Sequence, residues 1–344
     1  MNLEQDKVVK MCVEKFHMKD VDHLNHLKNI SNSSNHYKKL SAAFFTAKLW
    51  PNNSIIKVAF MGNPDNISRT SLSELENIRD SKGNALKLDP LQYEITRNNI
   101  DIITAIKRIV NERINPIMNL KYVFVDNLKD AQIRISFDST QGAWAFLGTD
   151  CLMNKDASEP TMNLGWFDVA TTIHEFFHTA GLIHEHQNPR GKAIDWNLDK
   201  VYQWAENTQG WDKETTYRNI IEKYSFDQVN GSQFDPESIM LYFFPGSLTN
   251  DNRGTNQNLV ISPVDAEYVN AVYSNAPETA QDFYKKVYNK DIPESVHLNA
   301  LGIGRGPRKQ TNNGEIGEFV SGLLWGLGII AVIYILAKYL LPKS

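Results

Sequence analysis

One stretch near the middle of the chain decides the fold: HEFFHTAGLIHE, residues 174–185. On a helix, side chains four residues apart lie on one face, so His174 and His178 present their imidazoles together. Gly181 stands where a helix commonly ends in a left-handed turn, and such a turn can bring His184 back towards the other two histidines. Three histidines around one point are typical of a zinc site that keeps a fourth coordination position open.

The residue after the first histidine adds chemistry to this pattern. Glu175 follows His174 directly, so its carboxylate can reach a water molecule at the same metal ion. The alternative is a helix whose histidines only fill the core, but the glycine and the third histidine at fixed offsets argue against it. We therefore predict one catalytic Zn²⁺ ion, held by imidazole nitrogens, which suit zinc.

The sequence on either side predicts a mixed α+β domain. Apolar and alternating runs predict strands at 55–60, 121–125, 133–137, 142–148 and 161–164. Helical spacing predicts helices at 99–114, 169–180, 197–206 and 263–273. Residues 1–41 begin with a helical pattern through Val8, Cys12 and Phe16 and become polar, so we expect a helical extension and a linker. Residues 276–316 are polar and rich in glycine, which predicts a second, flexible linker.

The C-terminal region has the composition of a membrane anchor. Residues 319–337 carry no charge and lie between Glu318 and Lys338, and about 20 apolar residues suffice to cross a bilayer. We predict a transmembrane helix over residues 317–341; the alternative is a buried core helix. Since residues 1–16 lack the apolar stretch of a signal peptide, we expect a single-pass tail anchor, a soluble domain on the cytosolic side or associated with a particle, and no conventional secretion.

Charge and cysteine content exclude two classes of protein. The net charge of −4 offers no basic surface for nucleic acid, so we expect no nucleic-acid partner. The two cysteines, Cys12 and Cys151, lie far apart in the sequence and cannot form a disulfide framework. This cysteine content favours folding in a reducing compartment.

A second motif, SIMLY, occupies residues 238–242. A methionine in an apolar run is usually core packing, but together with the histidine motif it resembles the Met-turn that lies beneath the metal in metzincins. Over residues 49–273 the chain resembles the astacin-like zinc metallopeptidases, most closely the bacterial and fungal ones. The likeness includes four further patches: LWP at 49–51, PTMNLGW at 160–166, HEHQNP at 184–189 and FDP at 234–236.

This resemblance implies a fold and a set of roles. The implied fold is the two-lobed α+β metzincin fold, a twisted mixed five-stranded sheet with two long helices above an irregular lower lobe, here over residues 42–275. The implied zinc ligands are His174, His178 and His184, with Glu175 as general base and acid. Structural support near the site comes from Met240, Gly181 and Glu185. Tyr242 matches the family tyrosine that stabilises the reaction oxyanion; the alternative is a packed aromatic side chain.

The expected function is that of a membrane-anchored zinc metalloendopeptidase. Its peptide or protein substrate would lie extended beside the strand at 142–148, whose alternative role is plain core structure. The competing hypothesis is a catalytically silent, membrane-anchored scaffold protein. Residues 1–48 contain no convincing aspartate or cysteine switch, and Cys12 is either a latch for the metal or a small buried hydrophobe. Substrate, glycosylation and oligomeric state stay open.

Overall fold

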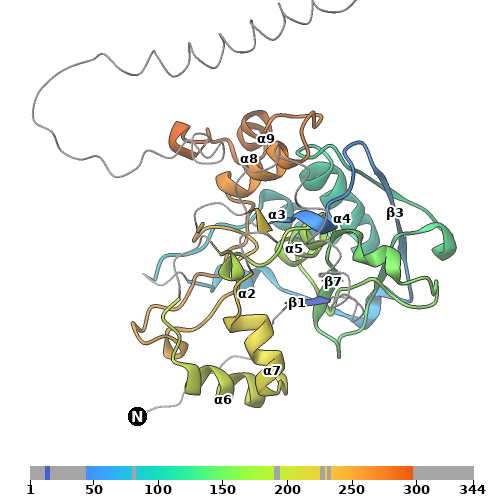
Figure 1. The fold of residues 1–344 in the computed structure, drawn as a ribbon. Helices are drawn as coiled ribbons and strands as arrows, with labels where there is room; N and C mark the ends of the chain where they lie inside the picture. Colours follow the sequence, from blue (N-terminus) through green and yellow to red (C-terminus); the bar gives the residue numbers. More distant parts are fainter. Residues whose placement is uncertain are drawn as a thin grey trace, which may run out of the picture. The chain divides into compact units, whose positions relative to one another are not determined.

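The computed structural model describes residues 12–15, 44–79, 83–189, 194–224, 229–230 and 234–296 (Figure 1). Its main sheet has six strands in the order β1-β7-β8-β6-β3-β5. These are β1 (Cys12–Lys15), β3 (Ile55–Phe60), β5 (Lys121–Phe124), β6 (Ile133–Ser136), β7 (Ala143–Phe146) and β8 (Met162–Asn163). All neighbours run parallel except β7 and β8, which are antiparallel.

Two small sheets complete the strands among the described residues. One pairs β2 (Phe44–Phe45) with β10 (Val229–Asn230), and the other pairs β4 (Ser68–Arg69) with β9 (Trp166–Phe167). The second of these lies directly before the helix of the histidine motif, and Thr70 donates its backbone N–H to the Phe167 carbonyl at 2.9 Å. It therefore helps to fix the entry to that helix.

Several of the helices share one hydrophobic core with the main sheet. The helices are α2 (Leu72–Glu76), α3 (Pro90–Arg97), α4 (Ile102–Ile109), which continues as the π-helical η3 (Val110–Ile114), α5 (Val169–Thr179), α6 (Leu198–Gln209), α7 (Lys213–Thr216), α8 (Pro263–Val272) and α9 (Ala280–Tyr288). In α4 the buried residues Ile102, Ala105, Ile106 and Ile109 recur at helical spacing and join Ile56 and Ile133 of the sheet. The apolar residues that recur at regular spacing in the sequence therefore form the face that each of these elements buries.

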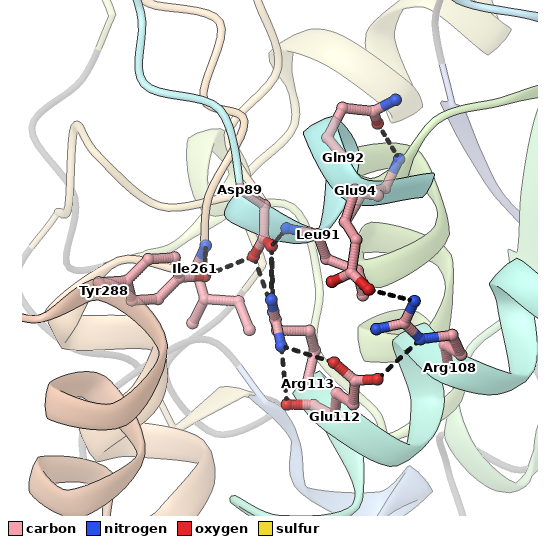
Figure 2. Close-up of polar contacts among 10 residues, drawn as sticks. Asp89, Leu91, Gln92, Glu94, Arg108, Glu112, Arg113, Ile261 and Tyr288 are labelled. Atoms are coloured by element: carbon pink, nitrogen blue, oxygen red, sulfur yellow. Dashed lines mark hydrogen bonds and ion pairs between the residues drawn. The ribbon is translucent and has the colours of Figure 1, made fainter. Parts of the chain in front are cut away.

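A buried ion pair ties the helices together (Figure 2). The Arg113 guanidinium contacts both carboxylate oxygens of Asp89, with Nη2 to Oδ1 at 2.8 Å and Nε to Oδ2 at 2.9 Å. The Tyr288 hydroxyl of α9 donates to Asp89 Oδ2 at 3.0 Å, and Asp89 also caps α3 by accepting from the Leu91 N–H. One carboxylate therefore joins α3, η3 and α9, and the donors around it satisfy a charge that would otherwise be costly to bury.

Most predicted elements are confirmed with small shifts at their ends. The α+β class and the mixed sheet hold, but the sheet has six strands because β1 adds to the edge formed by β7. The predicted helix through Cys12 is wrong at Cys12–Lys15, where pairing with β7 fixes an extended backbone. The predicted linker at 276–316 is wrong at Ala280–Tyr288: these residues form α9, whose Phe283 lies in the core.

The proposed membrane helix at 317–341 lies outside the described residues. Among the residues that the structure describes, no helix combines the length and the apolar character needed to span a bilayer.

Candidate metal centre

Helix α5 carries the first two histidines and begins at a well-defined cap. Asp168 is the N-cap, and its Oδ1 accepts from the Thr171 N–H at 2.7 Å. The Val169 N–H, which no helix carbonyl can satisfy, donates to Oε1 of Gln92 from α3 at 2.8 Å. The start of α5 is therefore held both by its own cap and by α3.

The end of α5 is built into the histidine motif. Gly181 adopts a φ of +98°, a conformation that costs glycine little. The Gly181 N–H donates to the His178 carbonyl at 2.8 Å, and the Leu182 N–H donates to the Phe177 carbonyl at 3.0 Å. The Leu182 carbonyl then accepts from His178 Nδ1 at 2.7 Å. The turn that ends the helix therefore also orients one of the histidines on it.

The turn brings all three histidines together. Nε2 of His178 lies 3.0 Å from Nε2 of His174 and 3.0 Å from Nε2 of His184. One ligand atom from each residue lies within 4.8 Å of those of the other two, and all three side chains are buried. Nitrogens bound to one tetrahedral zinc ion at about 2.1 Å are separated by similar distances.

Hydrogen bonding and burial prepare these imidazoles for a cation. His174 Nδ1 lies 2.8 Å from the Ile239 carbonyl, so in both His174 and His178 the Nδ1 atom donates and Nε2 keeps its lone pair. Burial lowers the pKa of His174 to about 4 and holds the pKa values of His178 and His184 well below 6.5. Neutral nitrogens with lone pairs that converge at 3.0 Å repel one another, and a metal ion at their centre removes that repulsion. The residues therefore fit a zinc ion.

The SIMLY motif forms a tight turn beside these ligands. The Leu241 N–H donates to the Ser238 carbonyl at 3.1 Å, and Met240 is buried at the turn. The turn supports two ligands through its backbone: the Ile239 carbonyl accepts from His174, and the Met240 carbonyl accepts from the N–H of Glu185, next to His184, at 3.0 Å. This arrangement places the predicted Met-turn next to the three histidines.

Comparison with solved structures gives the same assignment. One solved structure that this chain resembles is that of myroilysin. The two sequences are 28% identical, the match covers 68% of this chain and 99% of the myroilysin chain, and the TM-score is 0.51. The fold and the site are those of an astacin-like zinc metallopeptidase. The cofactor that the site fits is one zinc ion, and the enzyme class is that of the zinc-dependent peptidases.

Two further structures are less similar to this metallopeptidase. A second structure of myroilysin is 23% identical in sequence; the match covers 78% of this chain and 92% of that one, with a TM-score of 0.44. High choriolytic enzyme 1, a hatching enzyme zinc-protease from the medaka fish Oryzias latipes, is 15% identical, covers 68% of this chain and 98% of that protein, and has a TM-score of 0.36. No protein-family model and no curated protein matches the metallopeptidase.

Tyr242 lies against the histidine cluster in the metallopeptidase. The centroid of its ring is 3.9 Å from that of His184 and 5.0 Å from that of His186, which the sequence did not single out. Nε2 of His186 contacts the Asn219 carbonyl at 3.0 Å, and burial lowers the pKa of His186 to about 3. A neutral His186 therefore packs on the tyrosine without adding a positive charge near the metal site.

The two glutamates of the motif have different surroundings. Glu175 is completely buried on α5, directly after the first ligand. Glu185 Oε1 accepts from Asn188 Nδ2 and from the Asp235 N–H, both at 3.0 Å, and burial raises the pKa of Glu185 well above its usual range. These contacts fit the structural role expected for Glu185, since they join the third ligand's loop to the segment before the Met-turn.

The sequence also gave no reason to connect Asp265 with this site. It lies at the start of α8, where the S-x-x-D pattern of Ser262–Asp265 signals a capping box. Burial and the neighbouring Asp235 raise the pKa of Asp265 to about 7, while Ser238 and two backbone N–H groups favour its charged form. The S-x-x-D pattern can be recognised in the sequence, but the contact of Asp265 with the Met-turn cannot.

Proposed function

We propose that the chain hydrolyses internal peptide bonds of polypeptides, with Glu175 as general base and acid. The observation that carries this proposal is the convergence of three neutral histidine nitrogens, two of them from the helix that also holds Glu175. Three nitrogen ligands leave a coordination position for water or substrate, as in catalytic zinc sites and unlike structural ones.

Under this proposal, the chain's own side chains have separate roles. Zinc, when bound, supplies a Lewis acid that makes water acidic near neutral pH. Glu175 takes the proton of the attacking water and passes it to the leaving amine. Tyr242, whose ring packs on His184, donates its hydroxyl to the oxyanion that develops on the scissile carbonyl. His174 and His178 keep their Nδ1 protons on backbone carbonyls throughout.

The substrate is expected to pair with the outer edge of β7. Ala143, at the start of β7, belongs to the same buried cluster as Tyr242, so this strand lies close to the site. The outer edge of β7 is able to accept a strand, since β1 pairs with it in parallel from Cys12–Ala143 to Lys15–Phe146 (Figure 1). A substrate strand on this edge would have to displace β1, so the N-terminal segment would lower activity for as long as it stays there.

A direct test uses the full chain loaded with one equivalent of zinc and a mixed peptide library, with cleavage products identified by mass spectrometry. Glu175→Gln and a chelator serve as the two controls. Cleavage that both controls abolish supports the proposal. A protein that binds zinc, lacks residues 1–43 and still cuts nothing would refute it and favour the silent scaffold protein.

We also propose that residues 317–341 anchor the enzyme to a membrane, with the peptidase on the cytosolic side or associated with a particle. The support is the uncharged stretch at 319–337. The full chain should stay with membranes after alkaline carbonate extraction, whereas a chain ending at residue 316 should be released. Protection of the peptidase from added protease in intact vesicles would overturn the proposed orientation.

A further inference from the structure

We infer that Asp265 is a positioning residue for the metal ligands, acting on His174 through a relay of Ser238 and the peptide group between Ile239 and Met240. The inference rests on the zinc site within the proposed function, but not on peptide hydrolysis. Asp265 belongs to α8, remote in sequence from both the helix and the turn that form the site.

The Asp265 carboxylate accepts three hydrogen bonds in the contacts that the structure shows, and the acidic group near it is Asp235. Its Oδ1 accepts from the Ser238 hydroxyl at 2.7 Å, and its Oδ2 accepts from the N–H of Ile239 at 2.8 Å and from the N–H of Ser262 at 3.0 Å. The residue is only 5% exposed. An α8 cap would need only the contacts with Ser262, so the two bonds to the Met-turn serve another purpose.

The hydrogen bonds between Asp265 and His174 all point the same way. His174 Nδ1–H donates to the Ile239 carbonyl at 2.8 Å, and the other end of that peptide group, the Met240 N–H, donates to the Ser238 hydroxyl at 3.0 Å. The Ser238 hydroxyl donates in turn to Asp265. Each donor therefore points towards the carboxylate, and hydrogen bonds aligned in this way polarise one another.

Such a relay has two effects on the metal ligand. It draws the Nδ1 proton away from the ring and raises the electron density at Nε2, as a carboxylate hydrogen-bonded directly to a ligating histidine does. It also fixes the turn whose next carbonyl, that of Met240, accepts from the Glu185 N–H beside His184. One carboxylate therefore supports ligands on both α5 and the loop that follows it.

The test measures zinc affinity of the full chain by competition with a chromophoric chelator at pH 8. Ser238→Ala removes the relay and leaves the bonds of Asp265 to Ile239 and Ser262. Asp265→Asn removes the charge. Asp282→Asn is the control, because Asp282 stands at the same position of α9 as Asp265 does of α8, and its Oδ2 accepts from the hydroxyl of the N-cap residue Thr279 at 2.8 Å.

We expect the first two variants to bind zinc about 10- to 100-fold more weakly than the wild type, the range for residues that support a metal ligand from behind. Asp282→Asn should keep the wild-type affinity. The double variant Ser238→Ala/Asp265→Asn should lose little more than Asp265→Asn alone, because both changes interrupt one relay.

Zinc affinity within twofold of wild type for Ser238→Ala would overturn the inference, and so would an equal loss in Asp282→Asn. If Asp265→Asn fails to fold, Ser238→Ala decides the question. Because no peptide is cleaved in this assay, the inference can fail or hold whether or not the enzyme proves to be a peptidase.

Discussion

Replacing Arg113 by methionine should destabilise the peptidase strongly. Its side chain is 7% exposed and that of Asp89 is fully buried, and removing one partner leaves the other as an uncompensated charge. Such losses cost about 3–5 kcal/mol. Leu91 and Tyr288 still donate to Asp89 in the variant, which favours the lower end, about 3 kcal/mol.

The measurement is thermal unfolding followed by circular dichroism. At 2–4 °C per kcal/mol for a domain of about this size, the midpoint should fall by about 6–12 °C. Arg108→Met is the matched control (Figure 2). Arg108 makes two ion pairs at 2.9 Å, but its glutamate partners are 51% and 41% exposed, so its loss should cost at most about 1 kcal/mol.

The comparison of the two arginines decides whether burial determines how much each ion pair contributes to the free energy of unfolding. Equal changes in the unfolding midpoint for Arg113→Met and Arg108→Met would refute the reasoning. The result bears on the metal site as well, because Asp89 caps α3 and Gln92 of the same helix holds the first N–H of α5. A loosened α3 should loosen the start of the helix that carries two of the ligands.

Four other predictions concern the site. Glu175→Gln should lower kcat at least about 100-fold, with zinc stoichiometry unchanged by metal analysis; a fully active variant would remove Glu175 from the mechanism. Tyr242→Phe should lower kcat by about 10²–10³ with little change in thermal stability, because the ring contacts remain; a change in KM alone would contradict the oxyanion role. Burial lowers the pKa of His186 from 6.5 to about 3. Between these two pH values the unfolded chain binds a proton at His186 and the native chain does not, so the free energy of unfolding decreases as the pH falls below 6.5. In urea titrations of the zinc-free proteins between pH 6.5 and 4, the free energy of unfolding should therefore fall less steeply with pH for His186→Phe than for the wild type, by up to about 1.4 kcal/mol per pH unit. Deleting residues 1–43 should raise kcat/KM for peptides by freeing β7; unchanged kinetics would show that β1 does not compete with substrate.

Much of the domain could be predicted from local sequence because local interactions determine it. The strand at Ile55–Phe60 and the helix at Ile102–Ile109 follow from apolar periodicity, since each buries the face that its pattern defines. The three histidines could be predicted for the same reason: helical spacing and one glycine turn set their positions within a short segment.

The features that escaped prediction depend on contacts between distant residues. Cys12–Lys15 are extended because an edge strand lies beside them, a condition that their own pattern cannot show. Helix α9 lies in a segment of polar composition, and its contact with the core, through Ala280, Phe283 and Tyr284, distinguishes it from a linker. The bond between Asp265 and the Met-turn joins two segments whose proximity is a property of the folded chain.

The pairing of β1 with β7 has a further consequence for how the protein behaves in solution. An uncovered edge strand presents a row of backbone donors and acceptors that a second molecule can extend into an aggregate. β7 has little charge of its own to prevent this, since its four residues are Ala143, Trp144, Ala145 and Phe146. The β1 segment is therefore expected to protect this edge against self-association, and an enzyme that has lost it would depend on bound substrate or on dilution to avoid aggregation.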